Sequence, residues 1–295
     1  MSAPATSPGD GAPMVSVGIP AYNSERHLRE AIESILAQTF RDFELIISDN
    51  ASTDGTAAIC ESYAKQDPRV RCIHQPSNIG APRNYSFLVG CARGCYFKWS
   101  SANDTCEPSM LERCVDVLER DSSVVLCYGV TRFVDANGAA IQVYRGDFSV
   151  ADARPQDRYT TLRRHLGFNN AQNGVIRLHA LKRTRLVRPY IASDLAMMAE
   201  LALVGKFHLL PEVMLNRRMA EDSFSSQLSD SDRAKFIDPM SRASRRFDFL
   251  RLRYDFVRSI VRAPLSVGDK LRLLSTELHG LYWDLEQILE ILRRG

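Results

Sequence analysis

The chain has 295 residues, of which 45% are hydrophobic and 25% charged, so it is long enough for one α/β domain and an appendage. A formal net charge of +3 is too small to indicate a nucleic-acid partner. The seven cysteines include no CxxC pair, which predicts free thiols in a reducing compartment and not a zinc site or disulfides. No apolar run approaches the roughly 20 residues of a membrane span, and we expect a cytoplasmic protein.

The first strand and helix are expected directly after a proline- and glycine-rich stretch, residues 1–13, which predicts a disordered tail. Val15 to Ile19 is a short, largely β-branched run, and Pro20 is expected to end it because proline donates no hydrogen bond. Apolar residues between positions 28 and 36 recur at helical spacing, with Asn23 or the serine after it as the N-cap.

Residues 43–48 form a second apolar run. A strand that returns through one helix is expected to lie parallel to the first, so that both strands end at the same edge of a sheet. Ligands bind at the carboxyl ends of strands in open α/β sheets, which would bring together Tyr22, Asn23, Asp49 and Asn50. Neither GxGxxG nor GxxxxGK(S/T) occurs here, so the dinucleotide and P-loop hypotheses are weak.

At these residues the chain is similar to a known family. The segments PAYN and ILAQTFRDFELIISDNASTDGT resemble the opening of the family 2 glycosyltransferases of the GT-A fold, an α/β fold with a Rossmann-like mixed sheet flanked by helices. The resemblance implies that the tyrosine and its neighbours line the nucleoside, and that the polar pair after the second strand holds base and ribose. The corresponding residues are Pro20, Ala21, Tyr22, Asn23, Glu25, Asp49 and Asn50.

Asn50 stands where the family more often has a second aspartate. Its amide oxygen can still accept a hydrogen bond from the N3–H group of uracil or thymine, so a UDP or dTDP donor fits the resemblance.

The α/β alternation continues with a helix through residues 59–63, a strand over residues 70–74 and a helix over residues 82–92. His74 is interpreted as a strand-end residue. The segment NIGAPRN matches the family's NxGxxxN pattern. Within it, Arg83 either reaches the nucleotide or is a solvated helix arginine.

The next expected strand covers residues 96–99, and the resemblance implies that the family's DxD motif follows it. Two acidic groups there hold a divalent cation at the diphosphate of the donor. In this chain Ser101, Ala102 and Asn103 occupy the motif, with Asp104 next to them. Because only Asp104 is charged, Asp104 and Asn103 are expected to hold Mn²⁺ or Mg²⁺ weakly, or to leave the metal dispensable.

The chain between residues 108 and 170 is less specific. A helix from Pro108, a core strand over residues 124–128 and a hairpin around the turn at residues 135–138 are expected. Residues 145–170 are polar and irregular and contain basic pairs, which indicates either an acceptor-binding loop or a surface excursion.

The second specific match runs from residue 188 to residue 222. Asp194 opens an apolar helix there, and the resemblance implies that it is the general base; a plain N-cap is the alternative. A strand over residues 214–216 follows. The family commonly has a histidine near positions 219–220, which this chain lacks, and Arg217 and Arg218 could meet the diphosphate charge in its place.

Beyond residue 223 the resemblance fades, and the chain becomes helical and rich in arginine. One buried stripe is predicted at Leu250, Tyr254, Val257 and Val261. Ser266 and Asp269 predict a capping box for a last helix. That helix carries aliphatic residues spaced by three and four: Leu271, Leu274, Leu278, Leu281, Leu285, Ile288 and Leu292. We expect this seam to be buried, in a helical hairpin on the domain or in a homodimer, and contact with a membrane surface is a further alternative.

These patterns predict a GT-A domain over residues 14–222 and a helical extension over residues 223–295. The predicted activity is inverting transfer of a sugar from a nucleoside diphosphate to a hydroxyl of a glycan, lipid-linked or small-molecule acceptor, with Asp194 taking the acceptor proton. The alternative is a nucleotide-sugar-binding subunit without catalysis, which is favoured because the DxD position offers only one charged residue. A nucleotidyltransferase would need a glycine-rich loop with a lysine after the first strand, and Tyr22 and Asn23 do not provide one.

Overall fold

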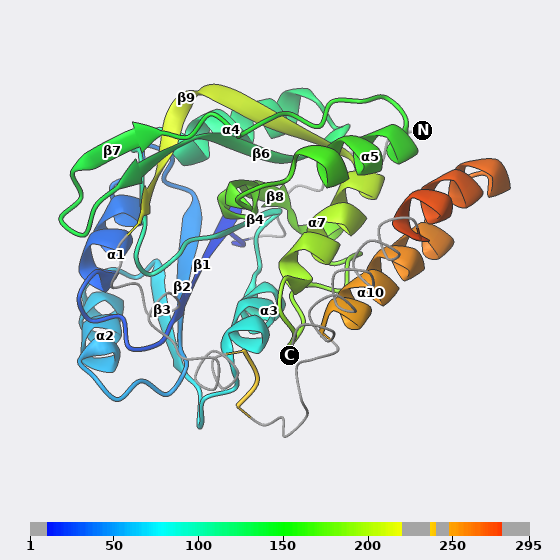
Figure 1. Ribbon diagram of the computed structural model, residues 1–295. Helices are drawn as coiled ribbons and strands as arrows, with labels where there is room; N and C mark the ends of the chain where they lie inside the picture. Colours follow the sequence, from blue (N-terminus) through cyan, green and yellow to red (C-terminus); the bar gives the residue numbers. More distant parts are fainter. Residues whose placement is uncertain (1–10, 220–236, 240–247, 279–295) are drawn as a thin grey trace.

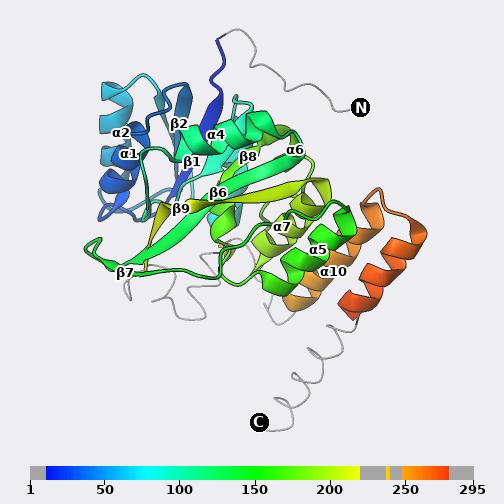
Figure 2. The ribbon, with the colours of Figure 1, turned by 90° about the horizontal axis from the view of Figure 1, so that it is seen from above.

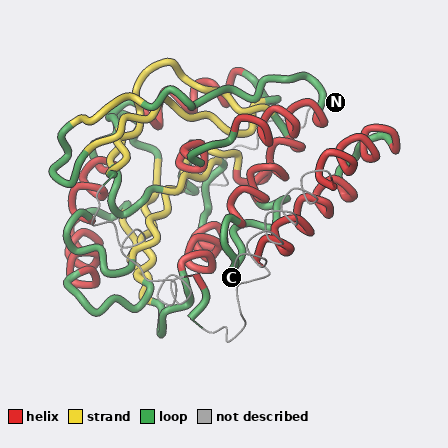
Figure 3. The backbone as a smooth tube through the Cα atoms, in the orientation of Figure 1, coloured by secondary structure: helices red, strands yellow, loops and turns green. Residues whose placement is uncertain are grey.

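The computed structural model describes residues 11–219, 237–239 and 248–278. Within these residues the chain folds around a nine-stranded mixed sheet with helices on both of its faces (Figure 1). The strand order is β3-β2-β1-β4-β8-β6-β9-β5, and β7 pairs with β6 outside this path. A tube drawing coloured by secondary structure shows the strands as a curved layer between the helices (Figure 3).

The N-terminal half alternates strands and helices, as predicted. Its elements are β1 (Val15–Ala21), α1 (Leu28–Leu36), β2 (Phe43–Asp49), α2 (Thr56–Gln66), β3 (Val70–His74), α3 (Ala81–Cys91) and β4 (Tyr96–Trp99). β1 pairs in parallel with both β2 and β4, and β2 with β3, so these strands end at one edge of the sheet.

Two predicted boundaries at this edge are wrong. β1 continues through Pro20, which pairs with Ser48, because the carbonyl of the next residue, Ala21, still accepts a hydrogen bond from the backbone N–H of Asn50 at 2.9 Å. The N-cap of α1 is His27, and neither Asn23 nor Ser24 caps the helix. Asn23 and Ser24 hold the neighbouring loop instead.

The second half completes the sheet with antiparallel and long strands. Its elements are β5 (Thr105–Cys106), α4 (Met110–Arg120), β6 (Val124–Val134), β7 (Ala140–Val143), α5 (Pro155–His165), the 3₁₀ turn η1 (Asn170–Asn173), β8 (Val175–Arg177), α6 (Leu178–Leu181), α7 (Ser193–Val204) and β9 (Lys206–Arg218). The predicted hairpin is β6–β7, and β6 and β9 are both longer than predicted.

The expectation of an irregular segment over residues 145–170 is wrong over its middle, which is the helix α5. Its Arg158 is buried and donates to the carbonyl oxygens of Ala202 and Leu203 at the end of α7, at 2.7 and 3.3 Å. An arginine that satisfies helix carbonyls is polar in sequence but belongs to the packed interior, so the polar pattern concealed the helix.

The helix α7 lies in the core, in agreement with its apolar sequence. Met198, Ala199, Leu201 and Ala202 are fully buried, and Leu195 packs against them. Seen from above, α5 and α10 (Asp248–Arg262) lie beside α7 at one side of the sheet (Figure 2).

The apolar faces predicted for the C-terminal helices are not the faces that pack against the domain, while their burial in a homodimer stays a prediction. Leu250, Tyr254 and Val261 are exposed by 40%, 60% and 52%, whereas Phe256 and Ile260 are buried against α7. In the helix over residues 267–278, Leu271 and Leu278 are exposed by 62% and 59%. One of the two hydrogen bonds of the predicted capping box is present: the backbone N–H of Asp269 donates to Ser266 Oγ at 3.1 Å.

Other predictions fall outside the described residues. These are the tail over residues 1–10, the seam beyond residue 278, and Glu221 and Asp222, which are alternatives to Asp194 as the general base. No helix among the described residues is long and apolar enough to cross a membrane.

Candidate active site

The loops after β1 and β2 are tied together by hydrogen bonds. Asn23, with φ at 46°, donates its backbone N–H to Ser52 Oγ at 3.0 Å. Glu25 Oε2 accepts from the backbone N–H of Gly55 at 2.6 Å. Tyr22 is half-buried between these loops and the strand end. The residues predicted to line the nucleoside therefore form one preordered edge.

Asp49 and Asn50 are both buried at the end of β2. Asp49 accepts from the backbone N–H of Ser52 at 3.1 Å and contacts His74 Nδ1 at 3.1 Å through its other oxygen. This contact raises the pKa of His74. His74 does end β3, as predicted, but it also fixes the acidic group expected to hold the nucleoside.

Asn50 links the end of β2 to the predicted NxGxxxN segment. Its Nδ2 donates to Asn78 Oδ1 at 2.9 Å, and its Oδ1 accepts from the backbone N–H of Ile79 at 2.9 Å. An amide oxygen has two lone pairs, so Asn50 Oδ1 keeps one acceptor position for a pyrimidine N–H.

Arg83 is neither a plain solvated arginine nor open to a nucleotide in this conformation. Its Nη1 donates to Asp238 Oδ1 at 2.7 Å, and its side chain is 37% exposed. A nucleotide phosphate would have to compete with this carboxylate for the guanidinium.

At the DxD position only one carboxylate is offered. Asp104 is buried, and its Oδ1 accepts from the backbone N–H of Arg218 at 2.9 Å. Burial raises the pKa of Asp104, while the hydrogen bond from Arg218 and the charges of Arg217 and Lys98 act in the opposite direction. No group of three or more histidine, cysteine, aspartate or glutamate side chains that could hold a metal ion occurs in the described part of the chain. Asp104 and Asn103 therefore fit a resident divalent cation poorly.

The two arginines at the end of β9 have different roles. Arg218 is buried, and its guanidinium donates to the carbonyl oxygens of Asn103 at 3.1 Å and Ala136 at 2.5 Å and to Glu30 Oε2 at 2.5 Å. These contacts make Arg218 a link between loops, and a diphosphate would have to compete with them for the guanidinium. Arg217 is half-buried and donates to Asn170 Oδ1 at 2.6 Å.

Asp194 stands in the first turn of α7 but does not cap it. The N-cap is Ala192, in the left-handed region with φ at 63°, and no side chain bonds the helix N-terminus. Asp194 Oδ2 instead accepts a hydrogen bond from Asn169 Nδ2 at 2.8 Å. The alternative of a plain N-cap is therefore wrong.

The phenol of Tyr85, on α3, is influenced by the charges of both Asp194 and Asp104. Burial raises the pKa of its phenol to about 12, and the negative charges of Asp104 and Asp194 add to this effect. Arg217 acts on the same phenol in the opposite sense. Asp104, Asp194 and Arg217, which are predicted from three separate segments, thus all affect the pKa of one phenol.

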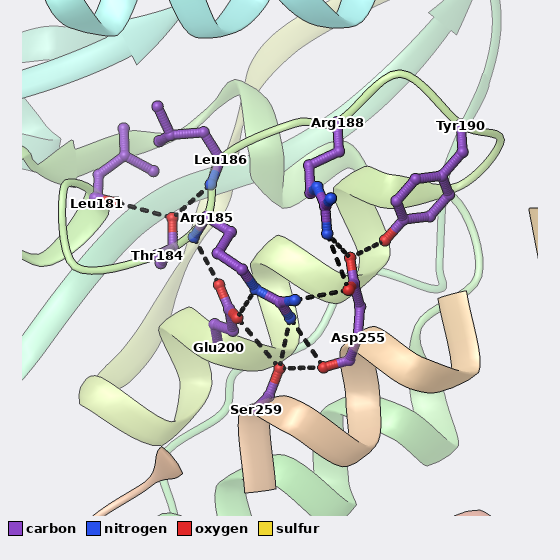
Figure 4. Close-up of polar contacts among 9 residues, drawn as sticks. All are labelled: Leu181, Thr184, Arg185, Leu186, Arg188, Tyr190, Glu200, Asp255 and Ser259. Atoms are coloured by element: carbon purple, nitrogen blue, oxygen red, sulfur yellow. Dashed lines mark hydrogen bonds and ion pairs between the residues drawn. The ribbon is translucent and has the colours of Figure 1, made fainter. Parts of the chain in front are cut away.

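The loop that leads into α7 is held by a buried polar network (Figure 4). Asp255 of α10 accepts from Arg185 at 2.5 Å and from Arg188 at 3.0 Å, and it also bonds Tyr190. Glu200 of α7 binds Arg185 at 2.7 Å. Glu200 is thereby occupied and is a poor substitute for Asp194 as a base.

Sequence reasoning missed three residues of this site: Tyr85, Asn169 and Asn170. The asparagine pair that follows Gly167 and Phe168 was the available signal, because two adjacent amides in an otherwise basic segment suggest specific hydrogen bonds. Tyr85 lies inside an ordinary helical pattern and gave no signal.

The mixed sheet, with polar groups at its parallel edge and a carboxylate at the start of a helix facing them, defines the GT-A class of nucleotide-diphospho-sugar transferases. The model of the family described as glycosyl transferase family 2 matches residues 16–185, more than half of the chain. The chain belongs to this family.

Solved structures with low sequence identity support the fold. The structure of S. aureus TarS 1-349 in complex with UDP-GlcNAc has a TM-score of 0.65 and 19% identity, covering 90% of this chain and 71% of that one. Mannosyltransferase PcManGT from Pyrobaculum calidifontis, in complex with GDP-Man and Mn²⁺, has a TM-score of 0.54 and 16% identity over 94% of this chain and 83% of that one.

Among curated relatives, chondroitin synthase of Escherichia coli is 37% identical over 130 residues, 44% of this chain and 19% of that protein. This chain spans between 19% and 38% of the length of the curated relatives that it matches.

Proposed function

We propose that the protein is an inverting glycosyltransferase that moves a sugar from a nucleoside diphosphate to a hydroxyl acceptor in bacterial polysaccharide or other glycan synthesis. The observation that carries this proposal is that Asp194 and Arg217 are hydrogen-bonded to two adjacent residues, Asn169 and Asn170, at 2.8 and 2.6 Å. This arrangement supports a carboxylate on the acceptor side and a cation for the leaving diphosphate. The polysaccharide synthase among the relatives supports the substrate class.

The reaction is a single displacement. The acceptor oxygen bonds to the anomeric carbon as the bond from that carbon to the diphosphate breaks, and the acceptor proton passes to the Asp194 carboxylate. Asn169 holds Asp194 by one oxygen and leaves the other for the hydroxyl. Arg217 meets the charge that develops on the leaving diphosphate, because a guanidinium binds phosphate oxygens in a fixed geometry.

The donor is proposed to be a uridine or thymidine diphosphate sugar. The acceptor position left on Asn50 Oδ1 supports a pyrimidine, and the contact that fixes Asp49 to His74 supports a role for this carboxylate at the ribose. Similar structures contain UDP-GlcNAc or GDP-Man. The preference for the nucleobase is therefore tested with uridine and guanosine diphosphate sugars. Any divalent metal is proposed to be weakly held, because Asp104 is the one charged ligand at its position.

A nucleotide-sugar-binding subunit without catalysis is the second candidate, favoured because the DxD position offers only one charged residue. Hydrolysis or transfer of radiolabelled UDP-glucose, UDP-N-acetylglucosamine, dTDP-glucose and GDP-mannose separates the two. Turnover of any of these sugars supports the transferase. Binding in a thermal-shift assay without turnover, after extended incubation with a cell-envelope extract as acceptor source, contradicts it.

The setting of the protein is proposed from its cysteines and from one exposed helix face. All seven cysteines are free thiols, which supports a reducing, cytoplasmic location. The exposed Leu250, Tyr254 and Val261 on α10 offer an apolar surface for a membrane or a second copy of the chain. Multi-angle light scattering and vesicle flotation test these two possibilities.

A further inference from the structure

Three consecutive residues that precede β8 contact the site. Asn169 donates to Asp194 at 2.8 Å, and Asn170 accepts from Arg217 at 2.6 Å. The guanidinium carbon of Arg217 also lies 5.1 Å from the ring centre of Phe168. We call residues 168–170 the acceptor loop. Its backbone places an aromatic ring beside the groups assigned above to proton transfer and to the leaving diphosphate.

The amide of Asn169 is only half used. Its Nδ2 donates to Asp194 and to Gln172 Oε1, but its Oδ1 is buried and has no hydrogen-bond partner among the described residues. The orientation of the amide is fixed, because an ionised carboxylate accepts only and must face the NH₂ group. A buried acceptor without a partner costs free energy, so a donor supplied by a ligand would be favourable at this atom.

Phe168 belongs to an aromatic cluster that is left partly open. Its ring centre lies 5.5 Å from those of Phe133 and Tyr144, in edge-on geometry with both. Tyr144 lies against Gly146 and Gly167, where an added Cβ would approach its hydroxyl to 2.3 and 2.9 Å. Phe133 is buried. Phe168 is 45% exposed, although the guanidinium of Arg217 lies over its ring.

We propose that the acceptor is a hexopyranoside, which stacks the apolar C–H face of its ring on Phe168 and donates one hydroxyl hydrogen bond to Asn169 Oδ1 while a neighbouring hydroxyl faces Asp194. This proposal rests on the proposed function. An exposed phenylalanine alone would not carry it, since single exposed apolar side chains are common. Its adjacency to an unsatisfied acceptor that also holds the base distinguishes this ring.

The chemistry of the loop disfavours other acceptor classes. A phosphate or carboxylate at Asn169 Oδ1 would place two acceptors together without a proton between them. An open-chain polyol can donate a hydroxyl but has no rigid apolar face for Phe168 to cover, and it loses more conformational freedom on binding. A pyranose ring supplies both features in one rigid group.

The test is saturation-transfer NMR on the full chain in the presence of UDP. The probes are the methyl β-pyranosides of glucose, galactose, mannose and N-acetylglucosamine, with sorbitol and glycerol 3-phosphate as non-ring comparisons. At least one pyranoside should receive saturation at its ring C–H protons, and neither comparison compound should. Phe168→Ala should weaken the binding of that pyranoside about tenfold, and Phe168→Tyr, which keeps the aromatic face, should restore it.

Val267→Ala, which removes an apolar side chain that is 74% exposed on the C-terminal helix, is the matched control and should bind as the wild type does. The inference is overturned if no pyranoside receives saturation, or if Phe168→Ala binds it unchanged. UDP, dTDP and GDP binding are measured by thermal shift in the same samples. If the wild type binds a nucleotide but no pyranoside, the proposed class of acceptor is contradicted and the proposed function is not. If the wild type binds neither a nucleotide nor a pyranoside, the proposed function is contradicted.

Discussion

Arg185, in the loop before α7, and Asp255, in α10, form a buried ion pair with Nη1 and Oδ1 2.5 Å apart. Arg185 Nη2 also donates to the backbone carbonyl of Asp255 at 2.9 Å. This pair joins α10 to the segment that leads into the first turn of α7, where Asp194 lies. The family match ends at residue 185, so α10 lies outside the matched residues yet supports the proposed catalytic group.

Asp255→Asn should therefore affect both stability and turnover. Removal of one partner from a buried charge group leaves Arg185 and Arg188 facing a neutral amide, at an expected cost of about 3 kcal/mol in the free energy of unfolding. At a temperature well below the melting point, kcat should fall while donor Kd stays unchanged, because Asp194 and not the nucleotide edge is displaced. Glu212→Gln, in an exposed ion pair with Arg113, is the control. Equal kcat in both variants would mean that α10 contributes stability only.

Asp194→Asn should lower turnover far more than donor binding. General-base catalysis contributes about 10²–10⁴-fold, and the amide keeps the shape of the side chain without its basicity. Asp116→Asn, an exposed aspartate of α4, is the control. The measurements are kcat, donor Kd and melting temperature. Turnover within a few-fold of the wild type would show that the general base is another residue.

The alternating half of the fold was predictable because each of its elements buries one regular face. The strands at residues 70–74 and 96–99 have the predicted limits. The C-terminal helices were not predictable in this way. In α10 the buried face includes Asp255 and Ser259 beside Phe256, since Arg185, Arg188 and Tyr190 satisfy the buried aspartate. A pattern that assigns polar residues to water cannot detect a buried polar face whose partners are distant in sequence.

The residues of the candidate site were likewise predictable from the sequence only in part. Local motifs indicated Asp49, Asp104 and Asp194, because Asp49 ends a strand, Asp104 lies in the loop that follows one, and Asp194 stands in the first turn of a helix. They did not indicate that the guanidinium of Arg218 is hydrogen-bonded to loop carbonyls, or that Arg217 lies beside Phe168. Adjacent residues of a strand point to opposite faces, and the role of each arginine depends on its partners, which come from the loops after β4 and β6 for Arg218 and from the acceptor loop for Arg217.

Metal removal should reduce activity only in part. One buried carboxylate with a raised pKa is a weak ligand, and Arg217 already supplies positive charge near it. In excess EDTA we expect measurable residual turnover, with Mn²⁺ restoring more activity than Mg²⁺ because Mg²⁺ sheds water reluctantly. Complete loss that micromolar Mg²⁺ reverses as well as Mn²⁺ would show that a stronger metal site exists.

Glu277 should make the stability of the chain depend on acidic pH. Its carboxylate is buried and accepts from Tyr159 at 2.9 Å, from Arg163 at 2.8 Å and from Arg253 at 2.9 Å. Burial alone would raise its pKa, but the hydrogen bonds and charges of these partners outweigh burial and hold the pKa below its ordinary value of 4.5. The folded state therefore binds this proton less readily than the unfolded state. The stabilisation is fully present above the ordinary pKa and is lost as the pH falls through the lower, folded-state pKa.

Glu277→Gln should accordingly reduce the free energy of unfolding at pH 7 by about 1–3 kcal/mol, because the arginines keep their positions but lose the charge between them. The difference from the wild type should shrink as the pH is lowered below 4.5, since the wild-type carboxylate is then increasingly protonated. Urea unfolding at several values between pH 3 and pH 7 measures this difference. Asp157→Asn, in the exposed pair with Arg154, should show no such trend. A difference that stays constant over this range would mean that Glu277 stabilises the helix packing by its shape and not by its charge.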